Sequence, residues 1–253
     1  MRLPVRHGWP SSCRTAARCV TILPEHRGSI GIEAVGLTLA VPSASRRLNV
    51  LEPIRPSGPA CSTDYVFDGT AARPYTETDP VHPLGAYAVS KLAGELYAQA
   101  YLDRPLIIRT SGVYGPGGLR TARGNFIELM LRLASGRQTI RVVEDHVASP
   151  AYAPAIAERT LALVRAGLHG IFHAGGGTAI SWYDYAKVIF RQAGLEPELR
   201  ATNEREYRTA ARRPKYSALS NAKMEAAGIP PMPSLDDAVR DYLAHRQPQT
   251  AAQ

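Results

Sequence analysis

A tyrosine and a lysine four residues apart are the pair in this sequence best suited to proton transfer. Tyr87 and Lys91 lie in the segment AYAVSKLAGELYAQAYL (86–102), which consists almost entirely of helix-compatible residues. Residues four apart on a helix share one face, and an ammonium beside a phenol favours the ionised phenolate. The pKa of the tyrosine then moves from about 10 toward neutral pH, which makes Tyr87 a usable general acid or base. An ordinary helix with an aromatic residue facing inward is the alternative.

Hydroxyl and carboxyl groups follow a short apolar strand just before that helix. The segment STDYVFDG (62–69) has the pattern of a strand that ends in a polar turn. Side chains at the carboxyl end of a parallel strand face the crevice where such sheets bind ligands. We therefore expect Thr63, Tyr87 and Lys91 to converge on one carbonyl oxygen. The simpler interpretation takes Thr63 as a β-branched strand residue and Asp64 as a turn cap.

The rest of the chain supplies alternating strands and helices to position these groups. Hydrophobic periodicity predicts strands at 105–115, 139–145 and 170–174, and helices at 86–102, 125–136 and 150–167. Two further helices are preceded by capping-box patterns, Ser181 with Asp184 and Ser234 with Asp237. Gly136 is expected to end the helix at 125–136, and Pro150 is expected to open the helix at 150–167. This order predicts an α/β fold, a Rossmann-like doubly wound parallel sheet.

The first 60 residues differ from the rest in charge and pattern. They hold eight Arg, no Lys and three Glu, so they carry +5 of the formal net charge of +8. They also hold seven Pro and show no sustained helix or strand period, although 19–23 and 32–41 have the composition of short strands. The predicted organisation is an atypical segment 1–60, half of a Rossmann domain at 61–150, a substrate-binding part at 151–246 interleaved with the sheet, and a disordered tail at 247–253.

Composition also limits which binding partners and which cellular compartment are expected for this chain. No run of five basic residues occurs, so a nucleic-acid partner is not expected. No apolar run reaches the ~20 residues that span a bilayer, and no export signal is recognised at the start. The three cysteines contain no CxxC pair, which argues against a disulfide framework or zinc site and favours a reducing cytoplasm. His169 and His173 are four apart on a predicted strand, where they would not chelate a metal.

A series of motifs in order resembles one known family. The motifs along 62–245 are, in order, STDYVFDG, PYTETDP, PLGAYAVSKLAGE, LIIRTSGVYG, GNFIELMLRLA, IRVVEDHVASP, GIFHAGGGTAISWYDYAKVIF and ARRPKYSAL. This series resembles the dTDP-4-dehydrorhamnose reductases, within the extended short-chain dehydrogenase/reductase superfamily. The resemblance implies reduction of the 4-keto group of a dTDP-sugar, dTDP-4-dehydrorhamnose, to dTDP-L-rhamnose, with NADPH or NADH as the hydride source.

The resemblance also implies roles for individual residues. Tyr87 would donate the proton to the keto oxygen, Lys91 would assist it and bind the nicotinamide ribose, and Thr63 would orient the carbonyl. Ser62 would contact the cofactor, and Thr63 and Asp64 the sugar nucleotide. The remaining implied substrate contacts are Gly112, Arg212 and Arg213. Both arginines lie in the ARRP motif, where a guanidinium suits a diphosphate, although a helix-end salt bridge is equally compatible.

Three positions depart from the family pattern. Gly112 replaces a tryptophan that lies against the substrate, and Leu219-Ser220 replaces a Leu-Asp pair. The GxxGxxG turn that holds the cofactor pyrophosphate is not recognised: its one candidate, Gly28–Gly31 with Ala34, lies only about 34 residues before Thr63. The first βαβ units are therefore expected to be missing or replaced, as a shifted reading frame or misassigned start would produce. The three glycines at 175–177 fit a turn better than a phosphate cradle.

Three functions remain open at this point. The first is an NAD(P)H-dependent dTDP-sugar reductase without a bound metal, as a possible homodimer. The second is a non-catalytic relative or gene fragment with a binding role, like the regulatory subunit of methionine adenosyltransferase. The third is an epimerase or dehydratase acting on another nucleotide sugar, since the same Thr, Tyr and Lys set serves those reactions and Gly112 leaves the sugar undecided.

Overall fold

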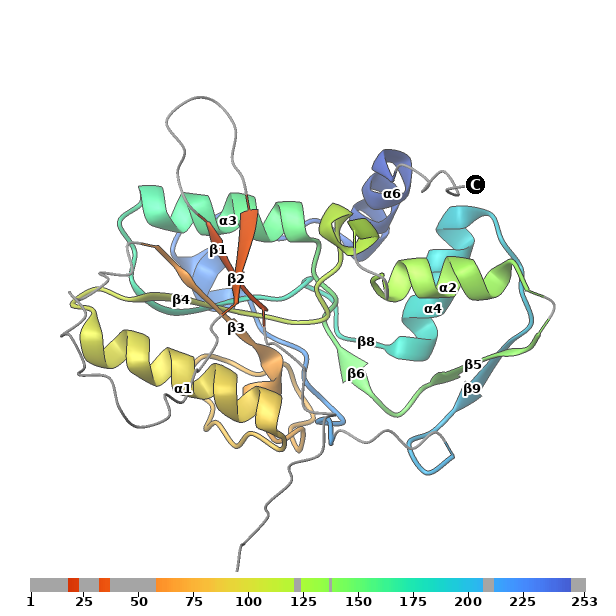
Figure 1. Cartoon of the computed structure of the whole chain (residues 1–253), viewed down its shortest axis with the longest axis horizontal. Coiled ribbons are helices and arrows are strands. Elements are labelled where there is room, and N and C mark those ends of the chain that lie inside the picture. The colour runs from red at the N-terminus through yellow and green to blue at the C-terminus, as the bar shows by residue number, and fades with distance from the viewer. Residues whose placement is uncertain are drawn as a thin grey trace, which may run out of the picture. The chain divides into compact units, whose positions relative to one another are not determined.

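The computed structural model (Figure 1) describes residues 18–22, 32–36, 58–120, 124–136, 138–206 and 212–246. The chain forms two compact units, Met1–Ile54 and Arg55–Gln253. In the first unit, β1 (Arg18–Ile22) and β2 (Ile32–Gly36) form an antiparallel pair with Arg18 opposite Gly36. Both fall where the sequence predicts short strands. The candidate turn at 28–31 and the tail at 247–253 lie outside the described residues.

A parallel three-stranded sheet forms the centre of the second unit. Its order is β3 (Ala60–Thr63), β4 (Leu106–Thr110) and β7 (Gly170–Ala174), with Thr63 beside Thr110 and Thr110 beside Ala174. The carboxyl ends of all three strands therefore meet at one edge, as expected for a parallel sheet. The central strand β4 is LIIRT, and its first four residues are buried, which is typical of a strand covered on both faces.

Helices cover the sheet on opposite faces (Figure 1). The helix α1 (Ala86–Tyr101) packs against β3, and α3 (Ala153–Arg165) contacts β4 from the other side. The helix α5 (Ala222–Ala226) packs on β7. This arrangement confirms the predicted α/β class with a Rossmann-like, doubly wound parallel sheet.

The carboxyl-terminal part adds a smaller layered structure. A second parallel pair joins β5 (Ile140–Val143) to β9 (Leu199–Thr202). Packed beside it are α2 (Phe126–Ala134), α4 (Trp182–Ala193) and α6 (Leu235–His245). Side-chain caps fix the starts of these helices: Asn125, Ser181 and Ser234 accept hydrogen bonds from the backbone N–H three residues on. The two predicted helix starts, with Ser181 and Ser234 as N-caps, are thus confirmed.

Three sequence predictions of elements need correction. The predicted strand 62–69 ends at Thr63, because the Thr63 side chain accepts a hydrogen bond from the Tyr65 N–H and starts the 3₁₀ turn η1 (Asp64–Val66). Pro150 does not open α3, since the following Ala151 is held extended by backbone bonds with Ser111 and Tyr114. The strand at 139–145 exists as β5, but it pairs with β9 and not with the main sheet.

Two small elements connect the main sheet to the carboxyl-terminal part. The strands β6 (Val147–Ala148) and β8 (Ile180–Ser181) form a short antiparallel pair. A further 3₁₀ turn, η2 (Pro116–Arg120), follows the loop after β4. One continuous hydrophobic core runs from β4 and β7 to α4 and α6, so the two parts share a single interior.

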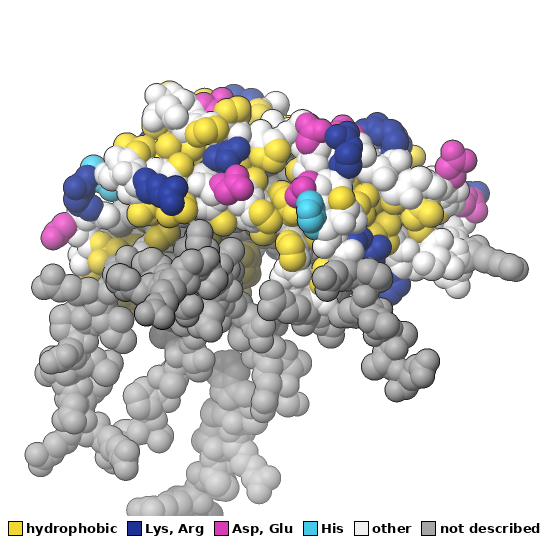
Figure 2. Space-filling model, turned by 90° about the horizontal axis from the view of Figure 1, so that it is seen from above, with side chains coloured by type: hydrophobic (Ala, Val, Ile, Leu, Met, Phe, Trp, Pro, Cys, Tyr) yellow, Lys and Arg dark blue, Asp and Glu magenta, His cyan; other side chains and the backbone are white. Residues whose placement is uncertain are grey.

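The surface above α3 and α6 mixes charges of both signs (Figure 2). Basic and acidic side chains alternate there with hydrophobic ones. Ion pairs within these helices include Arg240 with Asp237 on α6 and Arg159 with Glu158 on α3. Exposed hydrophobic side chains are also found on α1, where Val89, Leu96, Tyr97 and Tyr101 face solvent. In the part of the chain that the structure describes, no helix has the length and apolar character needed to cross a membrane.

Candidate active site

Three polar side chains at the end of β3 lie in different surroundings. Ser62, Thr63 and Asp64 are all buried. The Ser62 hydroxyl donates to the carboxylate of Glu95 on α1, whereas the Thr63 hydroxyl donates to Asp64 Oδ1 over 3.0 Å. The predicted cofactor contact of Ser62 gains no support from this geometry, because its proton is already committed to a buried carboxylate.

The Asp64 carboxylate joins three segments of the fold. Its Oδ2 accepts hydrogen bonds from Ser111 Oγ (2.7 Å), just after β4, and from Ser217 Oγ (2.6 Å), near the carboxyl-terminal end. Ser111 Oγ in turn accepts from the Ser149 N–H. Burial raises the pKa of Asp64 to about 6, and the hydroxyl donors oppose this shift only partly. Asp64 therefore holds Thr63 and the neighbouring loops in place, and its oxygens face these hydroxyls.

The raised pKa of Asp64 predicts a specific pH dependence of stability. A carboxyl whose folded-state pKa is above its unfolded value of 3.8 stabilises the fold below pH 3.8, and this stabilisation is lost as the pH rises through 6. Relative to Asp64→Asn, wild type should lose roughly 3 kcal/mol of unfolding free energy between pH 4 and pH 7.5. Urea unfolding of both proteins at several pH values measures this difference, and a constant or opposite difference would contradict it.

The proposed proton donor lies at the first turn of α1. Tyr87 is 50% exposed, and its ring lies edge-on to Tyr65 at 6.4 Å between centroids. The Tyr65 hydroxyl is hydrogen-bonded to the Arg213 guanidinium; burial, followed by the Asp64 charge, raises the pKa of Tyr65 to about 12. Lys91 follows one helical turn after Tyr87 and is partly buried. The structure thus brings Arg213, Tyr65 and Tyr87 together beside the carboxyl end of β3.

The sequence analysis missed a buried ion pair beneath α1. Glu95 and Arg109 are only 2% and 3% exposed. Arg109 binds Glu95 with two hydrogen bonds, Nε to Oε1 (2.9 Å) and Nη2 to Oε2 (2.7 Å), and Ser62 donates to the same Oε1. Glu95 is four residues after Lys91 and eight after Tyr87, so the pair ties their helix to β3 and β4. The sequence signal for this ion pair was Glu95 on the inward face of α1 together with Arg109 inside an apolar strand.

A neutral histidine lies beside this ion pair on the next strand. His173 on β7 is the register partner of Arg109 on β4 and is fully buried. Burial, followed by the Arg109 charge, lowers the pKa of His173 to about 3. Its Nδ1 lies 3.1 Å from the Tyr75 carbonyl oxygen, which can only accept, so the proton is on Nδ1. His169 is exposed beside Arg104, so the two histidines lie in different surroundings.

Two glycine positions from the sequence analysis are tightly packed. Gly112 has a φ of +51°, and a Cβ there would lie 3.1 Å from Pro150 Cα and 3.4 Å from Trp182 Cη2. At the 175–177 turn, the Gly175 N–H donates to Asn221 and the Gly176 N–H to Ser149. A Cβ on Gly176 would overlap the Pro150 carbonyl. These contacts agree with a packed turn, since two of its N–H groups are already used.

The ARRP segment reaches the site from the carboxyl-terminal end. Arg212 and Arg213 are exposed, and the Arg212 carbonyl lies next to Gly85, the N-cap of α1. Further along, Leu219 is buried, and its N–H donates to Ser149 Oγ. The Ser220 hydroxyl accepts from the Ala222 N–H at the start of α5. The Leu219-Ser220 pair therefore has a structural role here.

A group of carboxylates and one histidine lies away from Tyr87. Asp145, His146 and Glu204 place ligand atoms within 4.8 Å of one another. The Lys215 ammonium already lies 3.6 Å from Asp145 and 3.8 Å from Glu204. The Lys215 ammonium thus offsets part of the charge of these two carboxylates, and we assign the cluster no metal.

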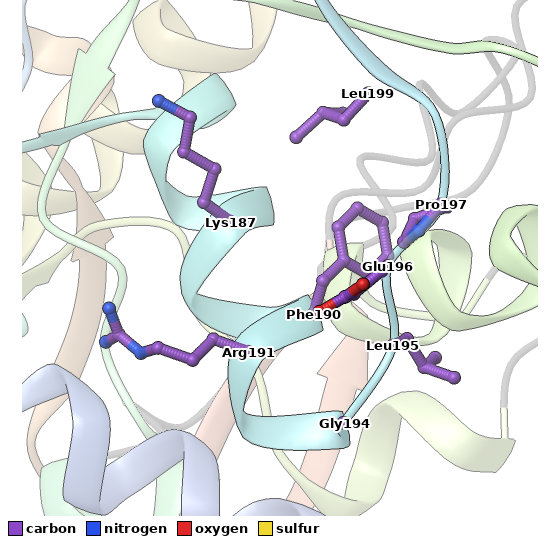
Figure 3. A pocket seen from close by; sticks show the side chains of 8 residues that line it. All are labelled: Lys187, Phe190, Arg191, Gly194, Leu195, Glu196, Pro197 and Leu199. Atoms are coloured by element: carbon purple, nitrogen blue, oxygen red, sulfur yellow. The ribbon is translucent and has the colours of Figure 1, made fainter.

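A surface cavity of about 440 Å³ lies between α4 and the segment leading to β9 (Figure 3). Figure 3 shows the side chains of Lys187 and Arg191 extending away from Leu195 and Pro197. Lys187 is paired with Asp184 and Arg191 with Asp236. The cavity has an apolar wall of Phe190, Leu195, Pro197 and Leu199 and brings together no pair of groups suited to catalysis.

Comparison with known proteins decides the family. Residues 60–247 match the model of the RmlD substrate binding domain. The chain belongs to the RmlD substrate-binding domain family. This matched region begins at β3 and contains Thr63, Tyr87, Lys91 and both ARRP arginines.

Curated relatives of this chain include bacterial proteins named for polysaccharide biosynthesis and for dTDP-sugar reduction. The spore coat polysaccharide biosynthesis protein SpsK of Bacillus subtilis is 41% identical over 187 residues, which is 73% of this chain and 63% of that protein. A dTDP-4-dehydrorhamnose reductase of Mycobacterium tuberculosis is 38% identical over 72% of this chain and 61% of its own length. The chain thus spans about three fifths of the length of these relatives.

Solved structures show the same fold over the same region. The dTDP-4-dehydrorhamnose reductase of Bacillus anthracis, in complex with NADP, superposes with a TM-score of 0.68 at 31% identity and covers 74% of this chain and 64% of its own. The corresponding protein of Clostridium acetobutylicum gives 0.69 at 34% identity, covering 73% and 64%. A UDP-glucose 4-epimerase of Thermus thermophilus, at 23% identity, shares the fold alone.

Proposed function

We propose that this chain carries the catalytic and sugar-nucleotide-binding part of an NAD(P)H-dependent reductase that reduces the 4-keto group of a dTDP-sugar. The proposed substrate is dTDP-4-dehydrorhamnose and the product dTDP-L-rhamnose. The observation that carries the proposal is the placement of Tyr87 and Lys91, one turn apart on α1, beside the carboxyl end of β3 in a member of this family. Relatives named dTDP-4-dehydrorhamnose reductase are 37–39% identical to this chain.

The proposed proton transfer uses groups that the fold already positions. Tyr87 donates its phenolic proton to the keto oxygen as that oxygen gains negative charge. The Lys91 ammonium stabilises the phenolate that remains, because opposite charges attract most strongly away from bulk water. The Thr63 hydroxyl donates its proton to Asp64 Oδ1 in this structure, so it would orient the keto oxygen by turning that proton toward the bound sugar. Arg213, held by Tyr65, and Arg212 suit the diphosphate of the substrate.

The residues present fit one end of a nicotinamide cofactor. Tyr87 and Lys91 offer a half-exposed phenol and an ammonium on one face of α1, the donors that a ribose requires. When bound, NADPH or NADH would supply the hydride. The only candidate for a pyrophosphate turn falls outside the described residues, so we assign the cofactor only to Tyr87 and Lys91. A dTDP-sugar as the small-molecule partner, a homodimer and a cytoplasmic location remain part of the proposal.

Cofactor consumption by the full 253-residue chain tests this function. With dTDP-4-dehydrorhamnose and NADPH or NADH, a reductase should oxidise one cofactor molecule per sugar reduced, which loss of cofactor fluorescence records. An epimerase would convert the sugar without net cofactor loss. Binding of dTDP-sugar without any turnover would instead support the non-catalytic role, and binding of neither ligand would overturn the proposal.

A further inference from the structure

The helix α1 carries Tyr87 and Lys91 but buries few of its side chains. Of its sixteen residues, only Ala88 and Glu95 are buried, whereas the twelve residues of α4 bury five. The N-cap of α1 is Gly85, which makes no side-chain capping bond. Deep apolar packing therefore contributes less to fixing α1 than to fixing α4, and the position of α1 depends strongly on the contacts of Glu95.

The Glu95 carboxylate joins α1 to two strands of the sheet at once. Its Oε1 accepts hydrogen bonds from Ser62 Oγ on β3 and from Arg109 Nε on β4, and its Oε2 accepts from Arg109 Nη2 over 2.7 Å. The guanidinium is held in turn over the Phe67 ring, 5.2 Å from its centroid. A bidentate pair fixes direction as well as distance, whereas apolar contacts are non-directional. This carboxylate therefore defines where α1 lies relative to β3 and β4.

The segments that Glu95 joins are those that carry the candidate active site. Ser62 directly precedes Thr63 on β3, and Glu95 lies eight residues after Tyr87 on α1. The Thr63 hydroxyl accepts a hydrogen bond from the Tyr65 N–H, and the Tyr65 ring lies 6.4 Å from the Tyr87 ring. Eight helical residues span about 12 Å, so a tilt of about 5° at Glu95 moves Tyr87 by roughly 1 Å. A misplacement of about 1 Å can lower a rate about 10²-fold.

We propose that Glu95 is a positioning residue for the proton transfer, because it holds Tyr87 in place relative to Thr63. Glu95 is only 2% exposed beneath the helix, so it acts through the position of Tyr87 and not by contact with the sugar. This inference rests on the proposed function and adds to it a residue outside the site itself. If Glu95 only stabilised the fold, any repacking that restored stability would also restore the rate. A positioning role predicts that stability returns and the rate does not.

Apolar replacement of the buried group separates these two roles in the full chain. The triple substitution Ser62→Ala, Glu95→Leu and Arg109→Met removes the hydrogen bonds of the Glu95 carboxylate and fills their volume with apolar side chains. With dTDP-4-dehydrorhamnose and NADPH, its kcat should fall at least about tenfold and its KM should change less than about threefold. Urea should unfold it at a concentration close to that for wild type. Glu95→Gln, which keeps the size and one acceptor oxygen, should have an intermediate kcat.

Combination with Tyr87→Phe shows whether Glu95 acts through Tyr87. Once the phenolic proton is absent, the position of the ring no longer limits its transfer. Adding the triple substitution to Tyr87→Phe should therefore lower kcat by less than about twofold, since the effects of coupled residues are not additive. Losses that simply multiply would show that the two act independently and would overturn the inference.

Leu163→Ala is the matched control for lost stability. Leu163 is fully buried on α3, on the face of the sheet opposite α1 (Figure 1), so its truncation should lower the urea midpoint and leave kcat within about twofold. A triple variant with wild-type kcat would overturn the inference and leave the proposed function standing. If the triple variant does not fold, wild-type kcat in Glu95→Gln would overturn it equally. If wild type oxidises no cofactor, the proposed function fails and the inference with it.

Discussion

Replacing Glu95 with alanine is expected to lower the free energy of unfolding by about 3–5 kcal/mol. The substitution leaves the Arg109 guanidinium, only 3% exposed, without its carboxylate, and it removes the acceptor of the Ser62 hydroxyl. A buried charge without a partner costs far more than a lost surface pair, because water cannot solvate it. Urea unfolding of both proteins at pH 7.5 measures the difference.

Two further variants show whether charge or volume causes this loss. Arg200→Ala removes an exposed ion pair with Glu198 and should change stability by less than about 0.5 kcal/mol. The triple substitution Ser62→Ala, Glu95→Leu and Arg109→Met replaces the whole buried group by apolar side chains and should recover most of the stability. A Glu95→Ala loss below about 1 kcal/mol, or a triple variant as unstable as the single one, would contradict the proposed cause.

Local pattern was enough to predict most elements of the second unit. The helix at 86–102 was visible from its composition, and the helices after Ser181 and Ser234 from their capping boxes. Pairing was harder, because a short strand such as β5 has the same local pattern whether its neighbour is β4 or β9. The strand β9, LRAT, was missed because four residues with two polar side chains give too little periodicity.

In the candidate site, likewise, some residues could be predicted from local sequence, whereas others depend on contacts between distant parts of the chain. Tyr87 and Lys91 share a helix face, so their spacing alone placed them together. Asp64 meets Ser111 and Ser217 through contacts 47 and 153 residues apart in the chain, which no local pattern contains. Glu95 was overlooked for a related reason: a glutamate on a helix is usually exposed, and only the position of Arg109 on β4 makes its burial possible.

Removal of the Tyr87 hydroxyl is the second change with a large expected effect. Tyr87→Phe should lower kcat for reduction of dTDP-4-dehydrorhamnose by roughly 10²–10⁴-fold, because no other group would then donate a proton from this position. The ring and its edge-on contact with Tyr65 remain, so KM should change little. Initial rates of NADPH oxidation over a range of substrate concentrations separate the two constants.

A control on the same helix makes this prediction specific. Tyr97→Phe removes a hydroxyl from a ring that is 65% exposed and stacked on Tyr101, away from β3, and should leave kcat within about twofold. Both variants should unfold at about the same urea concentration as wild type, since Tyr87 and Tyr97 are 50% and 65% exposed. If Tyr87→Phe kept more than a tenth of the wild-type kcat, Tyr87 could not be the proton donor, and Thr63, Tyr87 and Lys91 would have to act by positioning the sugar alone.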